Sequence, residues 1–247
     1  MKLTKPAIIL LIILGILVYL ALSYRHIYDF MGSAGLKSPY AVNNIFTVGN
    51  PSSFVHKKYV ALGDSLSAGV GSDSAKTTLV YLYAVNLGDK NTAIDVVNIA
   101  WPGDETIDVL NNQVPETIKM KPDYVTLFIG INDIHEKRST AEFKQNYQTI
   151  LNELMSKTDA QITVINLPYL GANNLITFPF STILDFRTKQ FNAIIASLVQ
   201  NNSRIRLIDL YSSSKKSLNT DNANYAKDLF HPSAQGYLLW AKTINEY

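Results

Sequence analysis

The sequence predicts an α/β domain in which a parallel β-sheet is covered by helices on both faces. Five short runs rich in Val and Ile have the length of buried strands, at 58–62, 95–100, 123–130, 161–167 and 204–210. Segments with helical periodicity alternate with these runs, at 78–87, 106–114, 141–157, 184–200 and 232–245. Such alternation is typical of a parallel sheet, because each parallel pair of strands needs a long crossover, which is usually a helix.

The predicted elements begin and end at recognisable residues. The first run, KYVAL, stops at Gly63-Asp64-Ser65, and these residue types favour turns. The second and third runs lead into Pro102-Gly103-Asp104 and Gly130-Ile131-Asn132-Asp133. The third helical segment opens with a capping-box pattern at 139–142, and Pro232 fits the first turn of the last helix. Polar clusters therefore follow several strands directly.

Composition limits the classes of function. The chain has 247 residues, 47% of them hydrophobic, which is enough for one sizeable domain. It has no cysteine, which excludes disulfides, thiolate zinc sites, a cysteine nucleophile and a lipid-modified N-terminal cysteine. Three of the 22 Lys and Arg residues lie in the first 25 positions, which leaves 19 to face 20 Asp and Glu. No nucleic-acid partner is expected, because such a partner usually requires a basic patch.

The N-terminal segment is predicted to be a membrane helix. Residues 6–24, PAIILLIILGILVYLALSY, contain no charge, and a helix of that length spans about 29 Å, close to the hydrocarbon thickness of a bilayer. Lys2 and Lys5 precede this stretch, whereas Arg25 alone follows it. This bias favours an N-terminus inside the cell and a main domain on the extracytoplasmic side of the cell membrane.

The sequence divides into an anchor, a linker and one domain. Residues 1–25 form the anchor, although a cleaved signal peptide and a secreted domain are the alternative, because Ala21-Leu22-Ser23 resembles a cleavage site. The apolar run is longer than a usual signal-peptide core, which favours the uncleaved anchor. Residues 26–57 have scattered Gly, Pro, Ser and Asn and are interpreted as a juxtamembrane linker. The domain proper is predicted over 58–247.

A serine, a histidine and an aspartate are predicted to meet at the carboxyl edge of the sheet, where open α/β sheets form their sites. A serine hydroxyl needs an imidazole to take its proton and a carboxylate to orient that imidazole. Ser65 follows the first strand, and His231 lies three residues after Asp228 in the loop after the fifth. The other histidines are placed less favourably, since His26 lies next to the apolar N-terminal segment, His56 precedes the first strand and His135 follows the loop after the third strand. The sequence therefore predicts a triad of Ser65, His231 and Asp228.

Three groups are candidates for stabilising an oxyanion. The backbone N–H of Ser65 is free if this residue opens a helix, because the first N–H groups of a helix lack internal partners. Gly103 can supply a second N–H, since it has no side chain to block close approach. Asn132 can supply a side-chain amide.

Four motifs together resemble the GDSL, or SGNH, hydrolase family. They are GDSLS at 63–67, the glycine in NIAWPGDET at 98–106, GIND at 130–133 and DLFHP at 228–232. The resemblance implies a flavodoxin-like three-layer α/β/α sandwich with a five-stranded parallel sheet, here preceded by one transmembrane helix. It also implies Ser65 as nucleophile, Asp228 and His231 as the rest of the triad, and Ser65, Gly103 and Asn132 as oxyanion donors.

The resemblance implies a serine esterase or acylhydrolase that forms an acyl-enzyme on Ser65. A small-molecule, lipid or glycan ester is the expected substrate, and no metal or organic cofactor is implied. Ala100 replaces a glycine that is common in the family's second block, which leaves Gly103 in place. Ser67 distinguishes GDSLS from the GxSxG elbow of α/β-hydrolases. A cell-surface O-acyltransferase with the same triad, and an inactive carbohydrate- or lipid-binding module on the same fold, are the alternatives.

One uncharged segment, PYLGANNLITFPFSTIL at 168–184, follows the fourth strand at the same edge. Four of its side chains are candidates for an acyl pocket or for contact with the membrane: Leu175, Ile176, Phe178 and Phe180. The alternative is that they simply pack on the domain.

Overall fold

The centre of the protein is a six-stranded β-sheet. The computed structural model describes residues 4–33, 44–89, 91–170, 175–200, 202–217 and 221–245. Its strands are β1 (Asn44–Gly49), β2 (Val55–Gly63), β3 (Thr92–Asn98), β4 (Tyr124–Phe128), β5 (Gln161–Ile165) and β6 (Ile205–Ile208), in the spatial order β1-β3-β2-β4-β5-β6. Strands β2 to β6 are parallel to one another, which confirms the five predicted strands.

The edge strand β1 was not expected from the sequence. It pairs antiparallel with β3, and its burial alternates along the strand. The segment 26–57, interpreted as a linker, therefore supplies β1 and the first residues of β2, while 34–43 lie outside the described residues. Local composition concealed β1, because its six residues include Asn and Gly and only the pairing with β3 stabilises the extended backbone.

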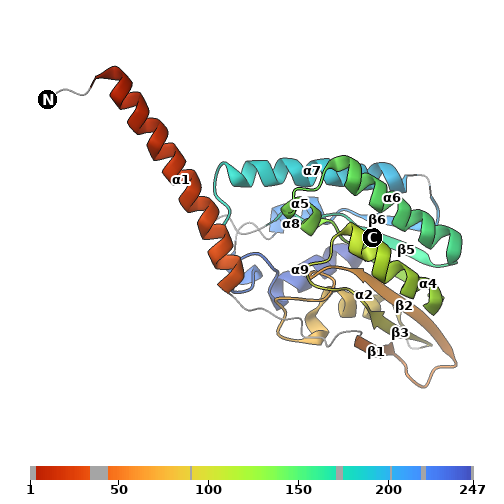
Figure 1. Cartoon of the computed structure of the whole chain (residues 1–247). Coiled ribbons are helices and arrows are strands. Elements are labelled where there is room, and N and C mark those ends of the chain that lie inside the picture. The colour runs from red at the N-terminus through yellow and green to blue at the C-terminus, as the bar shows by residue number, and fades with distance from the viewer. Residues whose placement is uncertain are drawn as a thin grey trace.

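Helices cover both faces of the sheet, as predicted. They are α1 (Lys5–Ser33), α2 (Leu79–Leu87), α3 (Thr106–Asp108), α4 (Val114–Met120), α5 (Ile131–His135), α6 (Thr140–Lys157), α7 (Phe180–Val199), α8 (Leu210–Ser217) and α9 (Ala234–Asn245). On one face α9 packs against both α2 and α8; on the other, α6 packs against α4 and α7 (Figure 1). The capping box of α6 is confirmed, since the Ser139 hydroxyl accepts from the Glu142 N–H at 3.1 Å.

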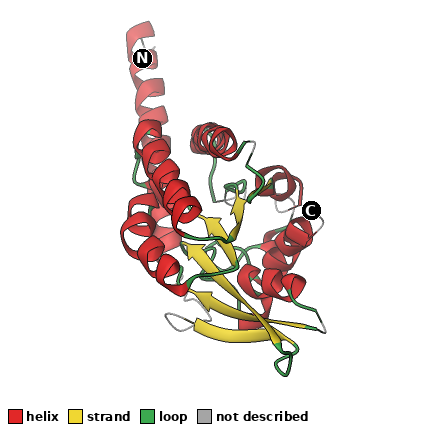
Figure 2. Ribbon diagram, turned by 90° about the vertical axis from the view of Figure 1, so that its right-hand side faces the viewer, coloured by secondary structure: helices red, strands yellow, loops and turns green. Residues whose placement is uncertain are grey.

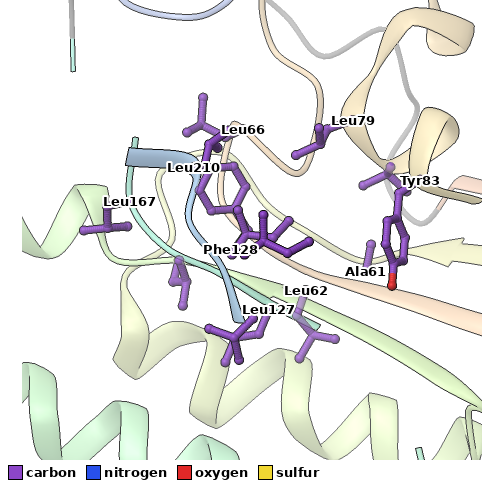
Figure 3. Close-up of a cluster of buried hydrophobic side chains, with 14 of the residues drawn as sticks. Ala61, Leu62, Leu66, Leu79, Tyr83, Leu127, Phe128, Leu167 and Leu210 are labelled. Carbon is purple, nitrogen blue, oxygen red and sulfur yellow. The ribbon is translucent and has the colours of Figure 1, made fainter. Parts of the chain in front are cut away.

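The core lies around the two central strands. All of Tyr59–Leu62 in β2 is fully buried, as expected for a strand covered on both faces. Figure 3 shows Leu62 and Leu127 on one side of these strands. On the other side lie Ala61 and Phe128, together with Leu79 and Tyr83 from α2. Burial on both faces explains why β2 and β4 read as continuous apolar runs.

The helix α1 projects from the domain (Figure 2). Its segment Lys5–Ile27 has 23 residues, is apolar enough to cross a membrane and is not buried by the rest of the protein. A signal sequence would have the same properties. The chain therefore has one N-terminal apolar helix that could be a membrane span or a signal sequence.

Candidate active site

Ser65 lies in a tight loop directly after β2. Residues 64–71 form successive turns rather than the helix considered from the sequence, since the Ala68 N–H bonds to the Asp64 carbonyl and the Val70 N–H to the Ser65 carbonyl, both at 2.9 Å. Asp64 and Leu66 on either side are buried, whereas Ser65 is partly exposed. The loop therefore presents the Ser65 hydroxyl at the carboxyl edge of the sheet.

A chain of hydrogen bonds joins Ser65, His231 and Asp228. The His231 Nε2 atom lies 2.9 Å from the Ser65 Oγ atom, and the His231 Nδ1 atom lies 2.5 Å from Asp228 Oδ2. The other carboxylate oxygen of Asp228 accepts from the backbone N–H groups of Phe230 and His231 at 3.0 and 2.9 Å. The structure thus brings the three predicted triad residues together, and their catalytic roles stay predictions.

The electrostatics of Asp228 favour a charged carboxylate. Burial alone would raise its pKa, but the hydrogen bond and the charge of His231, with the two backbone N–H groups, outweigh burial and lower the pKa. An ionised Asp228 accepts the Nδ1–H hydrogen of His231. The Nε2 atom of the neutral imidazole is then an acceptor facing the Ser65 hydroxyl.

Gly71 allows the histidine loop to approach the serine loop. Its φ is +94°, and a Cβ atom at this position would lie 2.4 Å from the Pro232 carbonyl oxygen and 3.0 Å from the His231 Cβ atom. A side chain would therefore push the two loops apart.

The three predicted oxyanion donors lie around one loop junction. Neither the Ser65 N–H nor the Gly103 N–H has a hydrogen-bond partner within the described part of the chain. Gly103 has a φ of +95°, and the space next to it is open. One Nδ2 hydrogen of Asn132 bonds to the Asp104 carbonyl at 2.8 Å, which orients the amide. The Trp101 N–H bonds to the Gly63 carbonyl at 3.1 Å and ties this loop to β2.

Comparison with known proteins identifies the family. The GDSL-like Lipase/Acylhydrolase family matches residues 61–239, which is most of the chain. The chain belongs to this family. A curated relative, the acetylxylan esterase of Geobacillus stearothermophilus, is 25% identical over 208 residues, which cover 76% of this chain and 92% of that protein. The resemblance seen in the four motifs is thereby confirmed.

Solved structures agree with this family and its fold. The lipase/acylhydrolase from Enterococcus faecalis is 30% identical, with a TM-score of 0.59 over 77% of this chain and 94% of that one. Axe2, an acetylxylan esterase from Geobacillus stearothermophilus, is 22% identical, with a TM-score of 0.57 over 80% and 94%. The α/β hydrolase LAE5 from the metagenome of Lake Arreo is 18% identical, with a TM-score of 0.60 over 80% and 94%. The last two show the fold alone.

Gln113 holds the site of this GDSL-like acylhydrolase together, and sequence analysis did not identify it. It ends a π-helical turn, Val109–Gln113, between α3 and α4. Its amide bonds to both backbone groups of Gly63, at 2.9 and 2.8 Å, and to the Asp104 carboxylate at 2.8 Å. Gln113 therefore fastens the end of β2 to the Gly103 loop. The sequence held no local signal for Gln113, because the burial of its amide and the π-turn, a feature frequent at functional sites, are visible only in the structure.

Asp64 is a buried acid next to the candidate nucleophile. Its carboxylate accepts from the Leu66 N–H at 2.9 Å, and its exposed fraction is 1%. Burial, helped by the negative charges of Asp133 and Asp104, raises its pKa to about 7. This acid supports the loop structurally, as expected for a residue after a strand.

The raised pKa of Asp64 leads to a prediction about stability. The folded protein holds a proton on Asp64 between pH 3.8 and about 7 that the unfolded chain releases, so the free energy of unfolding falls as pH rises through this range. Asp64→Asn cannot ionise and is expected to be more stable at pH 8 by up to about 4 kcal/mol, with little change at pH 4. Denaturant unfolding of the full chain in detergent at both pH values measures this difference. Asp73→Asn, on an exposed residue, is the control, and an equal gain there would contradict the assignment.

The side chains of Asp133 and His135 contact different residues. The Asp133 carboxylate accepts from the backbone N–H and the hydroxyl of Thr106, at 3.0 and 2.5 Å. The His135 ring packs against Phe230 with ring centroids 5.2 Å apart, and burial, with the nearby His231, lowers its pKa to about 4. Among the described residues, no group of three His, Asp or Glu side chains is arranged to hold a metal ion.

The structure separates the four residues predicted to form an acyl pocket. Leu175 and Ile176 are buried in the main core. Phe180 is partly buried against that core, whereas the Phe178 side chain is 70% exposed. Residues 171–174 of the same segment lie outside the described residues. The four side chains share no single surface, so the packing alternative describes Leu175 and Ile176 best.

Proposed function

We propose that this protein is a serine esterase that cleaves carboxylic esters through an acyl-enzyme on Ser65. The observation that carries the proposal is the unbroken hydrogen-bond chain from Ser65 through His231 to Asp228. It occurs in a member of an acylhydrolase family with an acetylxylan esterase among its relatives. Glycan O-acetyl groups and lipid acyl groups are the two classes of ester to consider.

The proposed reaction has two halves. In the first, the Ser65 Oγ atom attacks the ester carbonyl carbon while His231 Nε2 takes the hydroxyl proton. The tetrahedral intermediate collapses, the bond to the alcohol oxygen breaks, and His231 returns the proton to the departing alcohol. In the second half, water attacks the acyl-enzyme with the same proton transfers, which releases the carboxylic acid and free Ser65. Asp228 keeps the imidazole in the required tautomer and stabilises its positive charge.

The oxyanion of each intermediate needs hydrogen-bond donors. The free N–H groups of Ser65 and Gly103 and the second Nδ2 hydrogen of Asn132 are the proposed donors. The bond from Asn132 to the Asp104 carbonyl keeps the amide in one orientation before substrate arrives. Donors that are already oriented need no reorganisation during the reaction.

The proposed location is the extracytoplasmic face of the cell membrane. The helix α1 supplies an apolar segment of sufficient length, and the excess of Lys on its N-terminal side supports a cytoplasmic N-terminus. The domain then lies outside, where a glycan or a membrane lipid is available as substrate.

Covalent trapping tests the proposed function. The full chain in detergent micelles is treated with a fluorophosphonate, which reacts with activated serines, and its peptides are analysed by mass spectrometry. We expect one adduct, on the peptide with Ser65, and none in heat-denatured protein, because activation depends on the folded hydrogen-bond chain. Hydrolysis of p-nitrophenyl esters from acetyl to palmitoyl is measured in parallel.

Each alternative has its own outcome in this experiment. Turnover with an adduct on another residue would overturn the role of Ser65. An adduct with turnover only when a saccharide acceptor is offered would indicate an acyltransferase. Neither adduct nor turnover at any chain length would indicate a binding module.

A further inference from the structure

Three large apolar side chains are exposed at the start of α7 and directly before it. They are Phe178, Ile183 and Phe186, with exposed fractions of 70%, 56% and 60%, and they are called the α7 patch here. Ile183 and Phe186 are three residues apart in the helix and therefore lie on one face. Soluble proteins usually expose such side chains singly, so a group of them points to a contact surface.

The α7 patch adjoins the apolar helix α1. The Tyr19 hydroxyl donates a hydrogen bond to the Phe178 carbonyl at 2.7 Å, and the rings of Tyr24 and Phe180 lie 5.9 Å apart. Figure 1 shows the start of α7 (cyan) beside the lower half of α1. The beginning of α7 is thus attached to α1 within the segment that could span a membrane, Lys5–Ile27.

The two contacts on α1 correspond to the interfacial layer of a bilayer. Tyr19 and Tyr24 are five residues apart, which is about 7.5 Å along a helix. The whole bilayer is about 10–15 Å thicker than its hydrocarbon core, so each of the two interfacial layers is about 5–7 Å thick. Tyrosines are enriched in this layer. A spanning α1 therefore places Phe178 and Phe180 at the level of the lipid headgroups and the first acyl carbons.

The candidate active site faces the same side. In Figures 1 and 2 the strands run toward the side of the domain on which α1 lies, so the carboxyl edge with Ser65 is turned to it. The helix α5, which carries Asn132, packs against α7. The Arg187 guanidinium of α7 also bonds to the Arg138 carbonyl in the loop after α5. The helix that carries most of the α7 patch therefore packs against the helix that carries Asn132, one of the predicted oxyanion donors.

We propose that the α7 patch inserts into the bilayer interface and holds the catalytic edge against the membrane, so that the substrates are esters of membrane lipids. The substrate class rests on the proposed esterase function, whereas the lipid contact does not. Apolar insertion, more than charge, drives the contact, because Lys189 and Lys215 beside the patch are paired with Asp185. Vesicles of zwitterionic phosphatidylcholine, which carry no net charge, are therefore expected to bind the patch.

Site-specific quenching tests the lipid contact. The chain has no cysteine, so Ile183→Cys and Phe186→Cys each take one fluorescent label. The labelled full chain is reconstituted in phosphatidylcholine vesicles that contain nitroxide-labelled lipid. We expect several-fold stronger quenching at 183 and 186 than at the control Phe54→Cys, a fully exposed position between β1 and β2 at the opposite end of the strands.

Two outcomes of the quenching experiment would overturn the lipid contact. Equal quenching at all three positions would show that the α7 patch has no preferred lipid contact. The second outcome is a label that becomes buried but is not quenched by the lipid. If that burial depends on the ratio of protein to lipid, a second copy of the chain covers the patch.

Kinetics test the substrate class separately. The double variant Ile183→Ser/Phe186→Ser is expected to lose about tenfold or more of the rate on a long-chain ester in phosphatidylcholine vesicles, because two apolar contacts with lipid are lost. Its rate on soluble p-nitrophenyl acetate should match that of the unaltered chain and of Phe54→Ser. An equal loss on both substrates, or on neither, would overturn the proposal. If the unaltered chain hydrolyses neither ester, the esterase function fails, while quenching still decides the lipid contact.

Discussion

Replacing Ser65 with alanine is expected to lower kcat/KM for p-nitrophenyl acetate by at least about a thousandfold. The variant keeps the loop after β2 but lacks the oxygen that forms the acyl-enzyme. The residual rate would come from the donors around Gly103 and Asn132 acting on water. The comparison uses the full chain in detergent, with protein concentration checked by absorbance.

Ser67→Ala is the matched control for this experiment. The Ser67 hydroxyl is buried and donates a hydrogen bond to the Leu62 carbonyl at 3.2 Å, whereas His231 is bonded to Ser65. Most of the activity should remain in this variant. If both serine variants lose activity equally, the loss reflects damage to the loop and the role of Ser65 as nucleophile is wrong.

Asp228→Asn is expected to lower kcat by about 10³ to 10⁴ with the fold intact. Asparagine has almost the same shape, and its carbonyl oxygen can still accept from the N–H groups of Phe230 and His231. Its amide then donates toward His231 Nδ1, which favours the tautomer that carries its hydrogen on Nε2. That tautomer cannot accept the Ser65 proton.

The control for the aspartate is Asp221→Asn in the same loop region. The Asp221 side chain accepts from the Ala223 N–H at 2.8 Å, a bond that asparagine keeps. Kinetics and thermal unfolding of both variants are compared. Two results would contradict the proposed role of Asp228. One is that Asp221→Asn loses as much activity as Asp228→Asn, and the other is that the activity of Asp228→Asn falls only because less of the protein is folded.

The parallel part of the fold was predictable because each strand is buried on both faces. Such strands read as continuous runs of apolar residues, as KYVAL does, and they end at residues that break strands. The order of the four motifs was equally visible. Because parallel strands end at one edge of the sheet, Ser65, Gly103, Asn132 and His231 could be assigned to that edge from sequence alone.

Other features depended on partners that are distant in the sequence. The strand β1 forms because it pairs with β3. Gln113 joins β2 to the Gly103 loop because its amide is hydrogen-bonded to both Gly63 and Asp104. Ser65 lies at the beginning of a series of turns and does not start a helix, since its carbonyl bonds to the Val70 N–H. None of these partners is marked by a local pattern.

The segment 168–184 shows the same division for apolar residues. Sequence identified it as uncharged and adjacent to the site, but burial separated Leu175 and Ile176 in the core from Phe178 at the surface. Hydrophobicity alone cannot tell these positions apart, because apolar residues are found both inside and outside folded proteins. The hydrogen bond from the Tyr19 hydroxyl, more than 150 residues away in the sequence, holds the backbone of the exposed Phe178 beside α1.

Periodicity, length and turn chemistry are local properties, so the sequence was sufficient to predict the five parallel strands with their helices, the apolar N-terminal helix and the residue types at the carboxyl edge. The tertiary structure alone decided which atoms meet there. Hydrogen bonds such as that between His231 Nε2 and Ser65 Oγ join residues 166 positions apart, and their geometry arises only when the loops pack together at positions such as Gly71.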